Sequence, residues 1–183
     1  MNDVVISTTP ADADAVEEIR SHHAELTGAL TTKVSALAGA VRAGQDAGPA
    51  RDALVEWCGS ALLPHARAEE EVLYPAGGAL PRAQLLVEAL VAEHHTLGEL
   101  VDTLRRTGDP VDAVGAATAL RAVFESHAEK ENAQLLPALV GRLDLAELRI
   151  APVDLLGARG VRVHRRVGEL RLQLLVLSEK NAY

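Results

Sequence analysis

Apolar residues recur at alternating spacings of three and four along most of the first 141 residues. In the first stretch they are Val16, Ile19, Leu26, Leu30, Val34 and Leu37. Such spacing places the apolar side chains on one face of an α-helix. The pattern breaks at stretches rich in glycine and proline and then resumes. It predicts four amphipathic helices, at about residues 10–43, 49–75, 81–106 and 110–141.

The connections between these predicted helices are short, so neighbouring helices should run antiparallel. The expected fold class is therefore all-α, with an up-down-up-down four-helix bundle over residues 1–141. Residues 142–183 form a C-terminal extension in this reading. Its apolar spacing predicts a loop followed by a fifth amphipathic helix, which packs on the bundle or on a partner chain. The residues of that stripe are Val163, Val167, Leu170, Leu174 and Leu177.

Composition narrows the fold and function classes further. Hydrophobic residues make up 48% of the chain but aromatic residues only 2%, so Ala, Leu and Val must build the core, and Ala and Leu favour helix. The formal net charge of −8 argues against a broad nucleic-acid surface, although the run from Arg159 to Arg171 is basic. Cys58 is the one cysteine, which excludes an intramolecular disulfide and a cysteine-based zinc site, and we expect it to be buried.

No stretch reaches the roughly 20 apolar residues of a membrane span, and the N-terminus carries no basic region followed by a long apolar run. These observations predict a cytoplasmic protein that inserts into no membrane.

One motif occurs twice within the predicted helices. HARAEEEVLYP at residues 65–75 and HAEKENAQLLP at residues 127–137 both read His-x3-Glu-x3-Leu-x-Pro. A spacing of four places His65 beside Glu69, and His127 beside Glu131, on one helical face. In both cases that face is also the apolar face, which must point into the bundle.

The first and third predicted helices resemble each other as well, with SHHAEL and EHHTLGEL. In the first, the helical phase favours His23 over His22 as the inward residue, although His22 stays an alternative. In the third, His94 lies inside the apolar stripe and His95 lies off it. We expect His22 and His95 at the rim of the bundle.

Four histidines and two glutamates thus point into an aliphatic core. Buried carboxylates and imidazoles need partners, and these faces hold almost no Ser, Asn or Tyr. Hydrogen bonds between the histidines and glutamates would satisfy part of the set. A metal site would satisfy all of it, and imidazole with carboxylate suits iron, manganese or zinc. Six ligands are too many for one tetrahedral zinc, whereas two glutamates can bridge two ions. The predicted metal ligands are His23, His65, Glu69, His94, His127 and Glu131.

This set of residues resembles the hemerythrin-like, or HHE cation-binding, domain family, and the resemblance covers about residues 12–140. It implies a four-helix bundle around an oxo- or hydroxo-bridged pair of non-haem iron ions. By motif position, His23 and His65 would serve one iron and His94 and His127 the other, with Glu69 and Glu131 bridging. The partner would be dioxygen, hydrogen peroxide or nitric oxide.

Two departures from the oxygen-carrying hemerythrins stand out. Those proteins place a second histidine four residues after the ligand in the third helix, where this chain has Gly98, and they end with His-x4-Asp rather than His127-x3-Glu131. One iron then loses a ligand and the site is more open. This favours sensing, or peroxide or NO chemistry of a catalase or peroxidase kind, over reversible oxygen carriage.

Whether the chain is an enzyme stays open at this point. Two other functions compete with the di-iron hypothesis. One is iron storage or scavenging without turnover, and the other is a metal-free helical interaction module that uses the C-terminal stripe, which could also form a homodimer.

Five further residues lie outside the predicted ligand set. Glu70 and Glu71 are expected on a solvated face, with an extra ligand or a proton relay as the alternative. Tyr74 is expected to pack at the helix end, with a hydrogen bond donated toward the centre as the alternative. Pro64 should remove a backbone hydrogen bond and bend its helix one turn before His65. His164 is expected to be exposed.

Overall fold

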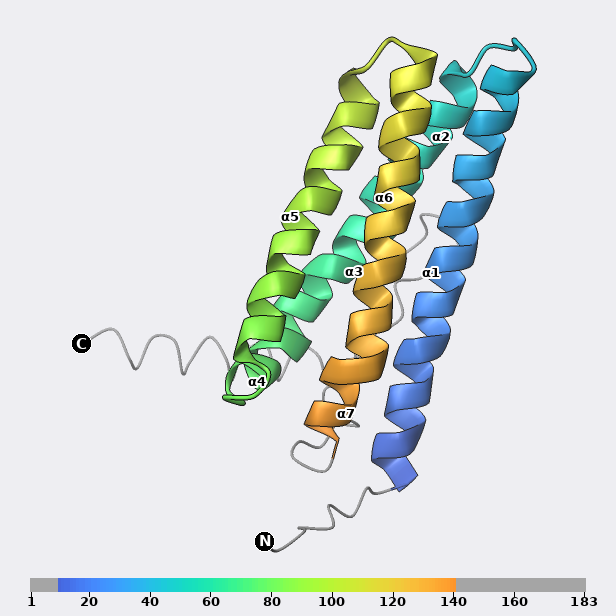
Figure 1. Cartoon of the computed structure of the whole chain (residues 1–183). Helices are drawn as coiled ribbons and strands as arrows, with labels where there is room; N and C mark the ends of the chain where they lie inside the picture. Colours follow the sequence, from blue (N-terminus) through green and yellow to red (C-terminus); the bar gives the residue numbers. More distant parts are fainter. Residues whose placement is uncertain (1–9, 141–183) are drawn as a thin grey trace, which may run out of the picture. The chain divides into compact units, whose positions relative to one another are not determined.

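The structure is a computed structural model, and it describes residues 10–140 of the chain. Within that range all the regular structure is helical, as Figure 1 shows. The predicted fifth helix, its stripe and His164 lie outside the described residues.

The helices form four successive rods within residues 10–140. The first rod is α1 (Pro10–Arg42). The second consists of α2 (Gly48–Trp57), η1 (Cys58–Leu62), α3 (Leu63–Ala68), η2 (Glu69–Leu73) and α4 (Tyr74–Gly78). The third is α5 (Gln84–Arg106), and the fourth consists of α6 (Pro110–Lys130), η3 (Glu131–Leu135) and α7 (Leu136–Leu139). The η segments are five-residue π-helical turns.

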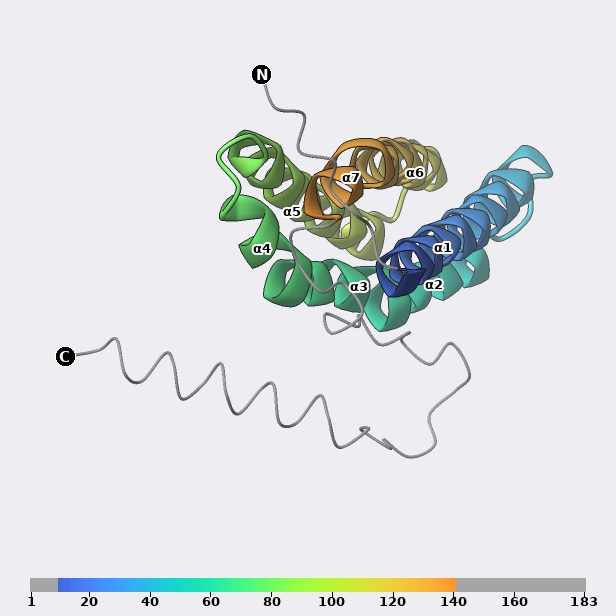
Figure 2. The ribbon, with the colours of Figure 1, turned by 90° about the horizontal axis from the view of Figure 1, so that it is seen from below.

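The rods pack as a bundle in which each lies beside two others. Helix α1 contacts α2 and α6, while α5 contacts α6 and the helices of the second rod. Figure 2, which views the bundle from its end, shows α1 and α5 on opposite sides and α6 across from α3. This arrangement confirms the predicted all-α four-helix bundle.

Local sequence signals set two of the helix ends. After α1, Gly44 adopts φ 64°, and the amides of Gly44 and Gln45 donate to the carbonyls of Val41 and Ala40. This is a Schellman ending, for which glycine is favoured because it has no Cβ. Asp109 caps α6 by accepting from the amides of Val111 and Asp112.

The third helix begins later than predicted. The expected start was Pro81, but the structure has turns up to Ala83 and begins α5 at Gln84. Backbone bonds from Ala83 and Gln84 to the Leu80 carbonyl close these turns. The structure therefore uses Pro81 inside a turn rather than in the first turn of the helix.

Each π-helical turn ends two residues before a proline, namely Pro64, Pro75 and Pro137. A proline ring clashes with the carbonyl four residues earlier and supplies no N–H. Those three carbonyls, on Ser60, Glu71 and Ala133, lie at the middle of the three π turns. The wider turn makes room for the ring, so the helix continues through Pro64 as α3 rather than stopping there.

The core consists of two apolar clusters separated by a layer of polar side chains. One cluster contains Leu26, Leu62, Leu97 and Phe124, and the other contains Val16, Leu73, Leu90 and Leu135. On every rod the predicted site residues lie between members of the two clusters, as His23 does between Val16 and Leu26. Cys58 is fully buried in the first cluster, as predicted, and burial raises the pKa of its thiol to about 12.

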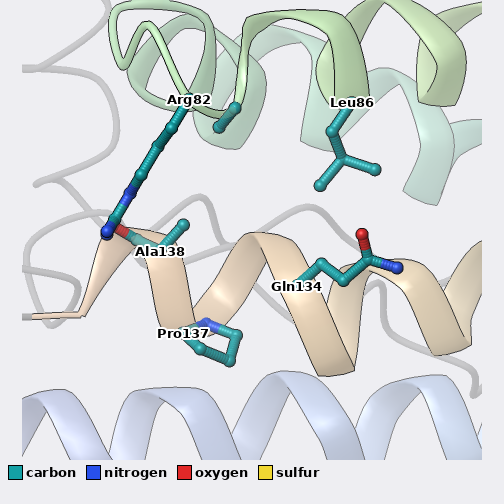
Figure 3. A pocket seen from close by; sticks show the side chains of 6 residues that line it. Arg82, Leu86, Gln134, Pro137 and Ala138 are labelled. Atoms are coloured by element: carbon teal, nitrogen blue, oxygen red, sulfur yellow. The ribbon is translucent and has the colours of Figure 1, made fainter.

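Two surface features lie apart from this layer. A surface pocket of about 340 Å³ lies between the start of α5 and the end of the fourth rod, where the guanidinium of Arg82 donates to the Ala138 carbonyl (Figure 3). Its lining contains none of the predicted site residues. A search of the described helices finds none with the length and apolar character needed to cross a membrane.

Gly77, in α4, packs closely against side chains of the third and fourth rods. A Cβ at Gly77 would lie 2.8 Å from Leu135 Cδ1 and 2.8 Å from Val87 Cγ2, whereas a Cβ at Gly78 would meet nothing within 4 Å. We expect Gly77→Ala to lower the free energy of unfolding by about 1–3 kcal/mol, because the neighbours must shift. Gly78→Ala, the matched control, should leave it unchanged or raise it. Chemical denaturation measures both, and equal effects would contradict the packing described.

Candidate metal centre

The six predicted site residues converge in the polar layer between the two apolar clusters. Their exposed fractions are all 6% or less, and both glutamates are fully buried. The neighbouring histidines differ as the helical phase predicted, because His22 is partly buried and His95 is exposed. Sequence phase therefore identified correctly which side chains enter the bundle. Their role as metal ligands stays a prediction.

Glu69 lies between two pairs of histidines. Its Oε1 is 3.1 Å from His23 Nε2 and 3.0 Å from His65 Nε2. Its Oε2 is 3.4 Å from His94 Nε2 and 3.9 Å from His127 Nε2. The possible ligand atoms of Glu69, His23 and His65 lie within 4.8 Å of one another, and so do those of Glu69, His94 and His127. One carboxylate thus faces two candidate metal positions, one with each oxygen.

Glu131 lies across the same two histidine pairs. Its Oε2 is 3.3 Å from His23 Nε2 and 3.5 Å from His127 Nε2. Its Oε1 accepts a hydrogen bond of 2.8 Å from the hydroxyl of Tyr74. That hydroxyl oxygen also lies 3.3 Å from Nε2 of both His94 and His127. The structure therefore shows the alternative for Tyr74, a hydrogen bond donated into the centre, and not packing at the helix end alone.

Aromatic rings close the layer on both sides. Phe124, the one phenylalanine of the chain, lies 6.3 Å from the His127 ring and 6.4 Å from the His65 ring, measured between centroids. Tyr74 stacks on His94 with a centroid distance of 5.3 Å. The centre is thereby separated from bulk water by apolar and aromatic side chains.

Three of the four histidines have a hydrogen-bonding partner at their outer nitrogen. His23 Nδ1 donates to Asn132 Oδ1 at 2.9 Å, and His94 Nδ1 donates to Glu70 Oε1 at 2.8 Å. His127 Nδ1 lies 3.2 Å from Glu93 Oε2, and the other oxygen of Glu93 accepts from Lys130. A proton on Nδ1 leaves the Nε2 lone pair directed into the centre.

His65 differs from the other three. Within residues 10–140, both of its ring nitrogens are buried without a hydrogen-bond partner. Its ring is instead surrounded by other rings, with the centroids of His22 and His23 at 4.9 and 5.2 Å. Burial, and then the neighbouring His65 and His23, lower the pKa of His22. We conclude that neighbouring rings hold the outer side of His65, while its Nε2 faces Glu69 Oε1 at 3.0 Å.

Four residues outside the predicted ligand set contact it, namely Tyr74, Asn132, Glu70 and Glu93. For Tyr74 the contact was only the alternative prediction, and counting at an α-helical 100° per residue turns its side chain well away from Glu69. In the π turn the Tyr74 amide instead donates to the Glu69 carbonyl, five residues back, so the two residues stack. The Leu-Tyr-Pro end of the first motif, against Leu-Leu-Pro in the second, was the available signal. Asn132 was not predicted: these faces were expected to hold almost no Ser, Asn or Tyr, but Asn132 and Tyr74 both contact the site.

Glu70 and Glu93 are the other two. Glu70 was expected on a solvated face, and its side chain is indeed 38% exposed, but its carboxylate reaches His94. Glu93 immediately precedes His94 in the sequence, yet its carboxylate binds His127 on another rod. A contact between helices of this kind depends on how they are rotated against each other, which the sequence pattern does not specify.

The pKa values of the two buried glutamates are shifted in opposite directions. Burial opposes the ionisation of Glu69, but His65 and hydrogen bonds from the surrounding histidines outweigh it and hold the pKa of Glu69 well below its usual range. For Glu131, burial and the negative charge of Glu69 both raise the pKa well above its usual range. Burial also lowers the pKa of His94, but the nearby carboxylates of Glu69 and Glu70 outweigh this and raise it.

The donor set fits metal ions. Nε2 of His94 lies 3.1 Å from Nε2 of His127, so without a cation one of these two nitrogens must keep a proton, whereas a metal ion could bind both lone pairs. Among the described residues, Glu69 Oε2, Glu131 Oε2 and His65 Nε2 are buried without a hydrogen-bond partner. Lone pairs and carboxylate oxygens at such distances repel one another unless positive charge lies between them.

In a comparison with known families, the hemerythrin HHE cation binding domain matches residues 14–139. The chain belongs to the hemerythrin HHE cation-binding domain family. The match spans the four rods, and the matched HHE domain contains every predicted site residue. Searches of curated proteins and of solved structures return no match.

The stability of the metal-free HHE domain should depend on pH differently in wild type and in Glu131→Gln. A glutamate with a raised folded-state pKa contributes stability below its unfolded pKa of about 4.3, and this contribution is lost as the pH rises through the folded pKa. Glutamine keeps an acceptor for Tyr74 without a charge. We therefore expect Glu131→Gln to stabilise the metal-free protein at pH 7 by about 1–4 kcal/mol, with little difference near pH 4.

Thermal unfolding of both metal-free proteins across pH 4–8 measures this difference. Wild type should become less stable relative to the variant as the pH rises. A variant that is less stable than wild type at pH 7 would show that Glu131 is ionised and well solvated by its neighbours in the folded state.

Proposed function

We propose that this protein is a hemerythrin-like non-haem di-iron protein that binds, senses or reacts with a small oxidant such as O2, H2O2 or NO. The observation that carries the proposal is the position of Glu69, whose two oxygens face two different pairs of histidines. A carboxylate placed in this way can bridge two ions. The membership of the chain in a cation-binding family supports the same reading.

The six predicted ligands would form two metal positions. Position 1 comprises His23 and His65, and position 2 comprises His94 and His127. Glu69 and Glu131 are shared, because Glu131 Oε2 lies near His23 of position 1 and His127 of position 2. Each ion would thus receive two imidazoles and a share of two carboxylates.

Iron is the metal that best suits this set within the family. Cys58, the one thiol, lies in the apolar cluster and not in the polar layer, so the donors are nitrogen and oxygen only. Such donors suit iron, manganese and zinc, and a carboxylate-bridged pair in a helical bundle is a common setting for iron. Bound iron would supply the electrons that reduce the oxidant.

The side chains around the centre select for small partners. The apolar clusters and the Phe124 and Tyr74 rings enclose the polar layer. One helical turn after His94, Gly98 has no side chain, and a Cβ added there would meet nothing within 4 Å. The chain therefore carries no side chain at the position where the oxygen carriers have a further histidine ligand. A centre enclosed in this way would admit only small partners such as diatomic gases and peroxide.

Tyr74 is the group best placed to handle a proton in this layer. Its hydroxyl donates to Glu131 and lies against both histidines of position 2. Burial, and then the charges of Glu131 and Glu69, raise the pKa of Tyr74, so in the metal-free protein it stays a donor. It can orient Glu131 and can donate a hydrogen bond to a small partner in the same layer.

Metal analysis of the purified protein tests the ligand assignment. We expect close to two iron ions per chain in wild type and one or fewer in His94→Ala, because position 2 would lose a ligand. His95→Ala is the matched control, since His95 is the exposed neighbour on the same helix, and it should keep wild-type iron. A protein that holds only zinc, or equal iron in both variants, would contradict the assignment.

The visible absorption spectrum tests the reaction with an oxidant. The reduced protein should change its spectrum on adding O2, H2O2 or NO, and the change should be absent in His94→Ala. Oxygen evolution from added peroxide would show enzymatic turnover. Iron that is held loosely, with no spectral change on any of these additions, would identify a storage or scavenging protein instead.

A further inference from the structure

The outer hydrogen-bond partners of the histidines differ between the two positions. In position 2 both histidines are backed by carboxylates, His94 by Glu70 at 2.8 Å and His127 by Glu93 at 3.2 Å. In position 1, His23 is backed by the neutral amide of Asn132 at 2.9 Å. The outer nitrogen of His65 has no hydrogen-bond partner in the part of the chain that the structure describes.

We propose that the two metal positions are unequal: position 2 binds its ion first and tightly, and position 1 binds the second ion more weakly and exchanges it. Glu70 and Glu93 act as the positioning residues that set this order. The inference rests on the proposed two-metal function and adds to it the order of loading and the residues that determine it.

The physical reason is the basicity of the ligating nitrogen. A carboxylate that accepts the Nδ1 proton of an imidazole draws that proton away and increases electron density at Nε2, and it also fixes the ring orientation. An amide oxygen does the same more weakly because it carries no net charge. Loss of such a partner typically lowers metal affinity 10- to 100-fold. Position 2 has two such carboxylates and position 1 has none.

Net charge favours the same order. Glu69 and Glu131 are shared by both positions, so their charges do not distinguish them. Glu70 and Glu93 add negative charge beside position 2 only. Lys130 pairs with Glu93 and offsets part of that charge, but Glu70 remains on the other histidine. Beside position 1 the nearest additional ring is His22, 4.9 Å from His65, which contributes no negative charge.

Titration of the metal-free protein with cobalt(II) tests the order. Cobalt(II) accepts the same nitrogen and oxygen donors as iron(II), and its visible absorption reports the ligands of each ion bound. Wild type should bind two ions in two separate steps. His23→Ala should keep the tight step and lose the weak one, whereas His94→Ala should lose the tight step.

The outer partners are tested by nearly isosteric variants. Glu70→Gln and Glu93→Gln should each weaken the tight step by about 10- to 100-fold and leave the weak step within a few fold. Asn132→Asp should strengthen the weak step, because it places a carboxylate behind His23 and so narrows the gap between the steps. Glu71→Gln is the matched control, since Glu71 is the exposed neighbour of Glu70 and should change neither step.

Three results would overturn the inference. They are two ions bound with one common affinity, a tight step that survives in His94→Ala, and a Glu70→Gln protein that titrates like Glu71→Gln. Circular dichroism of each metal-free variant verifies that it folds. Two equal steps would leave the proposed two-metal function standing, whereas a wild type that binds fewer than two ions would refute the proposed function itself.

Discussion

The structure depends on one electrostatic constraint: six ionisable side chains lie buried in a layer between two aliphatic clusters. Neither carboxylate has enough hydrogen-bond donors among the described residues, since Glu69 Oε2 and Glu131 Oε2 have none. Without cations the layer must retain protons on groups that would otherwise lose them, and this lowers stability at neutral pH. Ions that bind only the folded chain would stabilise it in proportion to their affinity. Folding and metal loading are therefore coupled through the same side chains.

The backbone places these groups with a recurring device. Glu69 and Glu131 are each the first residue of a five-residue π turn, and a proline follows two residues after the turn ends. A third such turn begins at Cys58 in the apolar cluster, with the same spacing to Leu62 and Pro64. The π turn thus allows a helix to continue through a proline. Its first residue is buried in all three cases, whether that residue is a glutamate or a cysteine. Of the residues stacked five positions later, only Tyr74 carries a hydroxyl, while Leu63 and Leu136 are apolar.

Much of the bundle and the inward-facing set could be predicted from the sequence, because both follow from helical periodicity. The phase rule separated His23 from His22 and His94 from His95, and the structure buries the residues that it chose. The same rule failed at Tyr74, where the backbone departs from 100° per residue. The phase rule also could not predict the contacts of Asn132, Glu70 and Glu93, because each contacts a histidine on a different rod. Such contacts depend on how one helix is rotated against another. The start of α5 was misplaced because Pro81 fits a turn as well as a helix start.

The wide turns determine which changes of length the chain can absorb. A π turn contains one residue more than the α-helical turn it replaces, so the residues after it keep the orientation that a regular helix one residue shorter would give them. Deletion of one residue between Glu131 and Leu135 would restore a regular α-helical turn and leave Leu136 and Leu139 facing the core, but the ring of Pro137 would then clash with the carbonyl four residues earlier. Related chains should therefore gain or lose residues in the connections between rods, where no proline ring has to be accommodated, and keep the interval from each glutamate to its proline constant.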